Sequence, residues 1–443
     1  MFPADQGKEV KYKGRNTCLA SYNKLDLFFV LLWKEEEVFQ MDKTQNVSTR
    51  VVLLVFMLGT FSVGMTEYVV TGLLTQFASD LHVEVSTTGL LLSAYAISVA
   101  VFGPILRIVT LKYSAKPLLV GLMAIFVISN IIAATAPTFE VLLLSRLFSA
   151  SMHAPFFGLC MTIGVNISPP HRRTAAIAAV QGGLTIAVML GVPFGSLLGG
   201  MLDWRFVFWL MVVLGALTLI GLIFVTPNMK AMEAPQLKKE LSMFKNKNVF
   251  MVLAIIVFGF SGVFTAYTFM EPMIREFAGF EVIGITVALL CFGTGAVVGN
   301  FVSGGVREDR LTESLMISLG ILAAVLLLFT FSLQYAPLVF VVTFLFGAGT
   351  FGTTPILNSK IIIAATEAPL LAGTVAASVF NLANFIGATL GTLLLDGGLT
   401  YTAITMIAAG IIVFGFLLAF VTHLVEDKSV FQRFGEGETE VHE

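Results

Sequence analysis

The chain has 443 residues, of which 57% are hydrophobic and only 12% are charged, about half the charged fraction of a soluble domain. This composition excludes an ordinary water-soluble enzyme, and a formal net charge of −2 gives no basic excess that would indicate a nucleic-acid partner. Cys18, Cys160 and Cys291 are far apart and show neither a metal-binding spacing nor a redox pair. We therefore expect no metal and no cofactor.

Long apolar runs dominate the sequence and predict an all-α membrane protein. A helix that crosses a bilayer needs about 20 apolar residues, and unpaired backbone is excluded from lipid. The uncharged block 314–359 is too long for one helix, and the Gln334-Tyr335-Ala336-Pro337 break divides it. The sequence thus predicts twelve transmembrane helices, over 51–75, 85–106, 117–136, 140–166, 174–202, 206–228, 248–270, 282–306, 314–332, 336–359, 368–395 and 397–425.

Lysine and arginine residues indicate the orientation. With the N-terminus inside, fifteen of them fall in cytoplasmic loops or the C-terminal tail, and only Arg205 and Arg275 fall in external loops. Cytoplasmic loops carry such an excess in membrane proteins. Both termini are therefore expected to be cytoplasmic, in a multi-pass protein of the cell (inner or plasma) membrane.

Breaks in the apolar pattern divide the chain into five parts. Residues 1–50 fit neither a span nor a signal peptide, so we expect an N-terminal extension outside the fold, with Met41 as the natural start; a helix lying on the membrane surface is the alternative. The other parts are a six-helix bundle over 51–226, a cytoplasmic linker with five lysines over 227–248, a second six-helix bundle over 249–425 and a cytoplasmic tail over 426–443.

The two bundles are expected to be pseudo-symmetric because similar segments recur at matched spans. Gly191 and Gly195 are four residues apart in span five, and Gly387 and Gly391 have the same spacing in span eleven. Each pair removes two side chains from one helix face, so a neighbouring helix can approach closely. Two parallel six-helix repeats with a site between them form a known transporter architecture.

Ionisable residues inside spans are costly and suggest function. Glu67 in span one and Arg146 in span four lie at similar depths, roughly 12 and 10 Å from the outer surface, so we predict a pair that couples transport to protons. A static pair, or an arginine that extends to the interface, is the alternative. His153 lies two turns after Arg146 and could relay protons or only pack, whereas Glu271 is expected to be a solvated helix end.

Neutral polar residues in the spans could line a substrate cavity, although hydrogen bonding between helices is the alternative for each. The candidates are Tyr68, Tyr95, Gln181, Tyr267, Asn300, Asn358, Asn381 and Asn384. The sequence has no G-x-x-x-x-G-K-[ST] phosphate loop. We therefore expect a protein that is not an enzyme and takes energy from an ion gradient or from the gradient of its own substrate.

Several segments resemble a known family. The Gly64–Leu74 segment, Arg146 with His153, and Glu367-Ala368-Pro369 resemble the drug:proton antiporter branch of the major facilitator superfamily, near the arabinose-efflux permeases. The resemblance covers about residues 50–425. The segment Gly191-Val192-Pro193-Phe194-Gly195 resembles the antiporter motif, and Gly304–Arg310 resembles the cytoplasmic loop motif that ends in Asp-Arg. The resemblance to this family implies gating roles for Gly191, Pro193, Gly195, Asp309 and Arg310.

The predicted function is secondary active transport, with proton-coupled efflux of small organic molecules (drug, sugar or nucleoside-like) by alternating access. Uptake or facilitated diffusion by the same fold is an alternative, and a membrane sensor or scaffold is another. The expected partners are a small-molecule substrate, protons and the lipid bilayer, with no nucleic acid, and the expected state is a monomer.

Overall fold

The computed structural model describes residues 48–110, 113–169, 173–227, 245–304, 306–307, 310–332, 335–365 and 369–439. They belong to a single compact unit, and every regular element within these ranges is helical. Most of the extension expected at residues 1–50 and most of the linker expected at 227–248 lie outside the described residues.

Twelve of the described helical segments are long and apolar enough to cross a membrane, as predicted. The first six spans are built from α2 (Thr49–Tyr68), η1 (Val69–Gly72), α4 (Val85–Thr88), α5 (Leu90–Thr110), α6 (Ala115–Ala134), α7 (Phe139–Ser151), α8 (His153–Asn166), α9 (Arg173–Ile186), η3 (Ala187–Gly191), α10 (Val192–Met201) and α11 (Trp204–Val225). The last six are α13 (Lys247–Tyr267), α15 (Val282–Ser303), α16 (Leu311–Ser332), α17 (Ala336–Ala364), α18 (Pro369–Asp396) and α19 (Tyr401–Thr439). The predicted division of the block 314–359 into two helices is confirmed, because α16 ends at Ser332 and α17 begins at Ala336, so the last two residues of the predicted Gln334–Pro337 break belong to α17.

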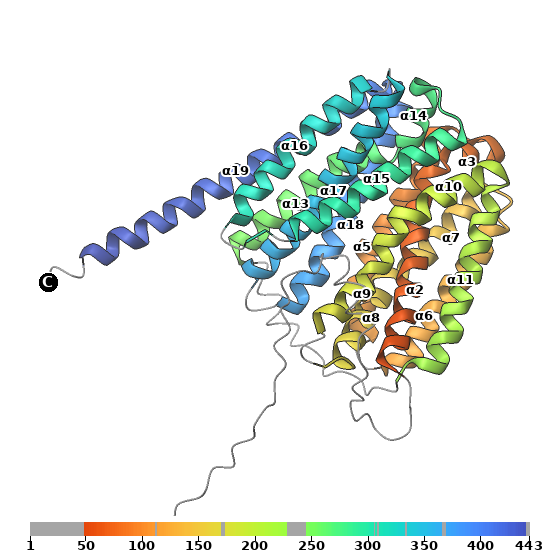
Figure 1. Ribbon diagram of the computed structural model, residues 1–443, viewed down its shortest axis with the longest axis horizontal. Coiled ribbons are helices and arrows are strands. Elements are labelled where there is room, and N and C mark those ends of the chain that lie inside the picture. The colour runs from red at the N-terminus through yellow and green to blue at the C-terminus, as the bar shows by residue number, and fades with distance from the viewer. Residues whose placement is uncertain are drawn as a thin grey trace, which may run out of the picture. The chain divides into compact units, whose positions relative to one another are not determined.

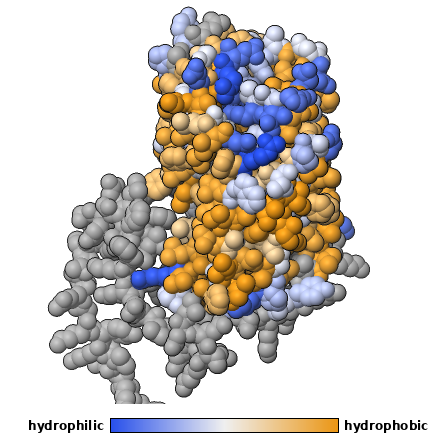
Figure 2. Space-filling view, turned by 90° about the vertical axis from the view of Figure 1, so that its right-hand side faces the viewer, coloured by the Kyte–Doolittle hydropathy of each residue, from blue (hydrophilic) through white to orange (hydrophobic). Residues whose placement is uncertain are grey.

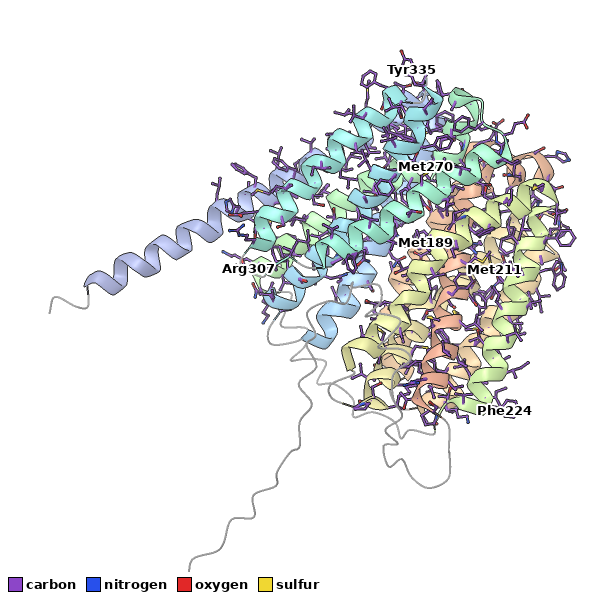
Figure 3. The ribbon with its side chains drawn as sticks, viewed as in Figure 1. Met189, Met211, Phe224, Met270, Arg307 and Tyr335 are labelled. Carbon is purple, nitrogen blue, oxygen red and sulfur yellow. The ribbon has the colours of Figure 1, made fainter. Side chains whose placement is uncertain are left out.

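The spans form two groups of six, coloured red to yellow-green and green to blue in Figure 1. Two short helices, α3 (Leu74–Leu81) and α14 (Met270–Ala278), follow spans one and seven at the same end of the bundle. The lysine and arginine distribution predicts that this end faces the outside of the cell, and we refer to it as the outer end. In Figure 3, Met270 and Tyr335 lie toward this end, and Phe224 and Arg307 toward the other.

The surface follows from the composition. Many large apolar side chains of the described spans are exposed, including Phe224 at 72% and Val302 at 69%. On the face shown in Figure 2, the hydrophobic residues cover most of the area and the hydrophilic ones gather toward its upper part. A protein in water rarely exposes so much contiguous apolar surface, whereas lipid tails solvate it.

Close helix packing confirms the predicted repeat. A Cβ atom on Gly195 would lie 2.2 Å from Val69, so span five packs directly on span one. A Cβ atom on Gly387 would lie 2.2 Å from the Ser261 carbonyl oxygen, so span eleven packs in the same way on span seven. The glycine pairs therefore make equivalent contacts in the two bundles.

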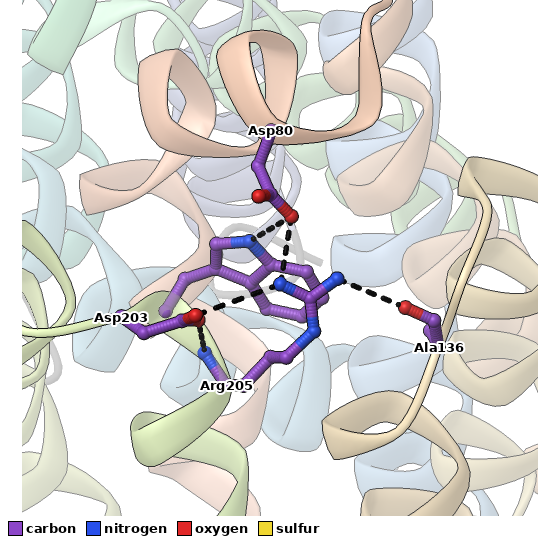
Figure 4. Close-up of polar contacts among 5 residues, drawn as sticks. Asp80, Ala136, Asp203 and Arg205 are labelled. Carbon is purple, nitrogen blue, oxygen red and sulfur yellow. Dashed lines mark hydrogen bonds and ion pairs between the residues drawn. The ribbon is translucent and has the colours of Figure 1, made fainter.

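A polar cluster ties the outer loops of the first bundle together (Figure 4). Asp80 accepts hydrogen bonds from Trp204 Nε1 (3.1 Å) and Arg205 Nη1 (2.7 Å), and Arg205 Nη2 donates to the Ala136 carbonyl (3.2 Å). Asp203 caps α11 by accepting from the Arg205 backbone N–H at 2.7 Å. Burial raises the pKa of Asp80, but the bonds from Arg205 and Trp204 outweigh it and hold that pKa below its ordinary value.

Candidate functional site

A small cavity lies between the two groups of helices, and both groups line it. Its walls come from α2 and α5 of the first group and from α13 and α18 of the second. The lining residues are Glu67, Tyr68, Leu92, Tyr95, Ala96, Phe264 and Asn384. Three of the predicted cavity residues, Tyr68, Tyr95 and Asn384, are therefore among them.

Glu67 is the carboxylate of this cavity, and only 9% of its surface is exposed. Its Oε2 atom lies 3.7 Å from Nδ1 of His153. Among the described residues, His153 and not Arg146 lies within ion-pair distance of the Glu67 carboxylate, so the predicted Glu67–Arg146 pair is not a direct contact. Arg146 is still close enough to interact electrostatically with the carboxylate.

Arg146 is fully enclosed, with 1% of its surface exposed. Its Nη2 donates to the backbone carbonyl of Thr66 at 2.6 Å, and its Cζ lies 4.5 Å from the centre of the Tyr95 ring. Its Nε has no hydrogen-bond partner. The guanidinium therefore faces the protein interior rather than lipid, and it is anchored at the residue that precedes Glu67.

His153 connects the carboxylate to the arginine. The Tyr95 hydroxyl lies 3.0 Å from His153 Nδ1, and the same nitrogen faces Glu67. The contacts thus run from Glu67 to His153, to Tyr95 and to Arg146. Pro155 explains the local backbone: it has no N–H to donate to Ser151, so α7 ends at Ser151 and α8 begins at His153.

The second bundle contributes aromatic and amide groups beside the cavity. The Tyr267 ring lies 6.5 Å from that of Tyr68, and its hydroxyl accepts a hydrogen bond from Thr71 Oγ1 at 3.3 Å. Asn381 and Asn384 each have a buried Oδ1 atom without a hydrogen-bond partner. Five of the predicted cavity residues do not line this cavity: Gln181, Tyr267, Asn300, Asn358 and Asn381.

The antiporter-like motif forms a distortion in span five. Pro193 would clash with the carbonyl of Met189 in a regular α-helix, and the chain adopts a π-turn over Ala187–Gly191 before α10 begins. Gly191 faces Met65 of α2, and Gly195 faces Val69 of η1. Figure 3 shows Met189 of the π-turn between the two groups of helices.

The same π-turn contacts the second bundle. A Cβ atom on Gly293 of α15 would lie 2.5 Å from the Met189 Cα atom, so the two backbones are in direct contact. Of the other two predicted gating residues, Arg310 is exposed and Asp309 lies outside the described residues. The π-turn is therefore part of the contact between the two bundles.

Glu271 was expected to be solvated, and this prediction is wrong. Its side chain is completely buried because α14 turns back against α3 instead of continuing span seven into water. The Glu271-Pro272 pair at the end of an apolar run gave no sign of this burial, which depends on a contact with residue 75.

Within the described ranges, no group of three or more histidine, cysteine, aspartate or glutamate side chains could hold a metal ion. The polar groups that face the cavity are one carboxylate, phenol hydroxyls and an amide. These groups can bind or release a proton and form hydrogen bonds with a solute. None of them is a nucleophile with a base beside it.

Comparison with known proteins places the chain in a family. The Major Facilitator Superfamily profile matches residues 56–373. The chain is 44% identical over 388 residues to the MFS-type transporter YfhI of Bacillus subtilis (strain 168), described as uncharacterized, covering 88% of this chain and 98% of that one. It is 29% identical to a probable sugar efflux transporter of Helicobacter pylori (strain HPAG1), covering 84% and 95% of the two chains.

Solved structures share the fold. The nucleoside transporter NupG superposes with a TM-score of 0.66 at 16% sequence identity, covering 84% of this chain and 98% of that one. The chain belongs to the Major Facilitator Superfamily, as its motifs indicate. It is a multi-pass transporter of the plasma membrane and not an enzyme, and it carries a small-molecule substrate.

Proposed function

We propose that this transporter exports small organic molecules in exchange for protons, and that Glu67 binds the proton. The observation that supports this proposal is the position of the carboxylate. Glu67 is the acidic residue in the wall of a cavity that both bundles share, so the proton and a solute would meet there. Alternating access then requires only that the bundles rock about this cavity.

The surroundings of Glu67 are compatible with both of its protonation states. As a carboxylate it faces His153 at 3.7 Å and lies in the field of Arg146. As a neutral acid it no longer needs the charge of Arg146, which lowers the cost of enclosing it in a lipid-surrounded core. A change in the position of Arg146 between the two states of the carrier would therefore change the proton affinity of Glu67.

The proposal includes a route for the proton. His153 can take or give a proton at Nδ1, and Tyr95 orients that nitrogen through its hydroxyl 3.0 Å away. Arg146 is held over the Tyr95 ring and stays charged in every case. In this assignment Glu67 binds the proton, His153 transfers it, and Arg146 stabilises the unprotonated carboxylate.

The cavity favours a neutral solute with hydroxyl groups. The unpaired Oδ1 atom of Asn384, which lines the cavity, can accept a hydrogen bond, and leaving it buried without a partner is costly. Phe264 and the Tyr68 ring supply apolar faces beside it. Sugars and nucleosides combine hydroxyl donors with an apolar face, and the Helicobacter pylori relative is named as a probable sugar efflux transporter.

Transport into everted membrane vesicles tests this function. A panel of monosaccharides, alkyl glycosides and nucleosides is offered with an inside-acid gradient, and at least one compound should accumulate. The Glu67→Gln variant should abolish gradient-driven accumulation. Glu140→Gln is the matched control, because Glu140 is exposed on the same bundle and should leave accumulation unchanged. Accumulation by the Glu67→Gln variant that equals the unaltered protein would remove Glu67 from the mechanism.

A further inference from the structure

A buried acidic residue joins the two bundles at the outer end. Glu271 of α14 is 0% exposed and accepts two hydrogen bonds at Oε2 from Thr75 of α3, one from the backbone N–H (3.3 Å) and one from Oγ1 (2.7 Å). Its Oε1 accepts from Arg275 Nε at 2.7 Å. Thr75 belongs to the first bundle and Glu271 to the second, so the burial of this carboxylate depends on the contact between them.

Three other hydrogen-bonded pairs join the bundles toward the same end: Thr71 with Tyr267, Ser86 with Asp396, and Ser93 with Thr389. Asp396 is exposed, so its carboxylate is solvated whether or not the bundles touch. Glu271 differs because contact between the bundles removes it from water. Its proton affinity must therefore depend on whether the outer end is closed.

The charges around Glu271 come from its own bundle. Arg275, on the same helix, forms an ion pair with it and is itself 31% exposed. Tyr401 of α19 also faces it electrostatically. On the opposing helix α3 the contacting residue is Thr75, which is uncharged. Burial raises the pKa of Glu271 by more than the bonds from Thr75 and Arg275 lower it.

We propose that Glu271 is a second proton-binding site of this transporter and that a proton bound there favours the closed outer end. Separation of the bundles would remove Thr75 from the carboxylate and admit water, which stabilises the charged form. The closed state therefore binds the proton more tightly than the open state, and acid favours closure by linkage. A tenfold difference in the proton-binding constant of Glu271 between the two states changes the ratio of open to closed molecules by up to tenfold.

This proposal rests on the alternating-access part of the proposed function and not on Glu67. A proton taken up from the outer solution would promote the closing step that follows proton binding in an exchange cycle. Glu271 would thus act on the gate, while Glu67 acts on the solute cavity.

The test measures the opening of the outer end directly. Spin labels are placed on cysteines at Ser79 of α3 and Glu281 at the start of α15, both exposed, and distances are measured in nanodiscs between pH 5 and pH 9. The native cysteines replaced beforehand are Cys18, Cys160 and Cys291. The fraction of long distances should increase as the pH rises.

Four variants make the test specific. Glu271→Gln should remain closed and lose the pH response, because the amide resembles the neutral acid. Glu276→Gln on the same helix should retain the response, and Glu67→Gln in the cavity should retain the part of the response that depends on Glu271. Thr75→Val removes a donor to the carboxylate without changing a titratable group, so its response should be larger and extend to higher pH.

Several outcomes would overturn the proposal. They are a distance distribution that does not change with pH, opening that increases with acid, a Glu271→Gln response equal to that of the parent, or a Thr75→Val response equal to that of the parent. Loss of the response in Glu67→Gln as well would assign the pH effect to the cavity. A Glu67→Gln variant that still transports like the parent would refute the proposed function alone, so the two failures are distinguishable.

Discussion

Replacing Arg146 by methionine should abolish proton coupling while leaving the free energy of unfolding nearly unchanged. Methionine is unbranched, flexible and uncharged, so it replaces the aliphatic part of the arginine side chain without the guanidinium. The carboxylate of Glu67 then loses a stabilising charge. Coupling should fail because the unprotonated state of Glu67 becomes too costly.

The magnitude follows from the contacts of Arg146. Its charge-assisted hydrogen bond to the Thr66 carbonyl contributes about 1.5–3 kcal/mol, and the cation–π contact with Tyr95 adds about 2 kcal/mol. Enclosing the charge costs several kcal/mol in the opposite direction, and the unpaired Nε adds to that cost. We therefore expect a net change in unfolding free energy within about 2 kcal/mol of zero.

Thermal unfolding in detergent and solute exchange in vesicles measure the two effects separately. The midpoint temperature of Arg146→Met should lie within a few degrees of that of the parent, and gradient-driven accumulation should be lost. Phe148→Met is the control, since Phe148 is exposed on the same helix. Coupled accumulation at the parental level in Arg146→Met, or unfolding of that variant at ordinary temperature, would refute the reasoning.

Two further predictions concern stability. Gly299→Ala should lower the midpoint of thermal unfolding by an amount equivalent to about 1–3 kcal/mol, because its Cβ would lie 2.0 Å from the Ala348 carbonyl oxygen. Gly410→Ala is the control and should not lower the midpoint, because a Cβ atom there would have nothing within 4 Å. Equal losses of stability in the two variants would contradict this account. Asp80→Asn should lower thermal stability at neutral pH, and because the pKa of Asp80 is held below its ordinary value, the difference should shrink as the pH falls through that lowered pKa. An Asp80→Asn difference that grows with acid would contradict the assignment of the Arg205 ion pair.

Apolar runs and glycine spacing were sufficient to predict the fold. The twelve spans follow from the length of helix that a bilayer requires, and the structure confirms them. Gly195 and Gly387 were predicted to allow close approach, and each faces the first span of its own bundle. These features are local, because a missing side chain affects whichever helix lies beside it.

The partners of the charged residues could not be predicted in the same way. Depth along a span suggested that Glu67 faces Arg146, but depth does not fix the rotation of each helix, and His153 is the residue within ion-pair distance. Glu271 was misjudged for a related reason, since its burial depends on Thr75, which is 196 positions away in the chain. Tertiary contacts of this kind leave no periodicity in the sequence.

Proton release on solute binding tests the central claim most directly. The purified carrier is placed in weakly buffered detergent solution, the compound identified by the transport panel is added, and the pH change is recorded. A single carboxyl that exchanges its proton for the solute should release up to about one proton per carrier, and Glu67→Gln should release none while still binding the compound. Equal proton release by the parent and by Glu67→Gln would contradict the account.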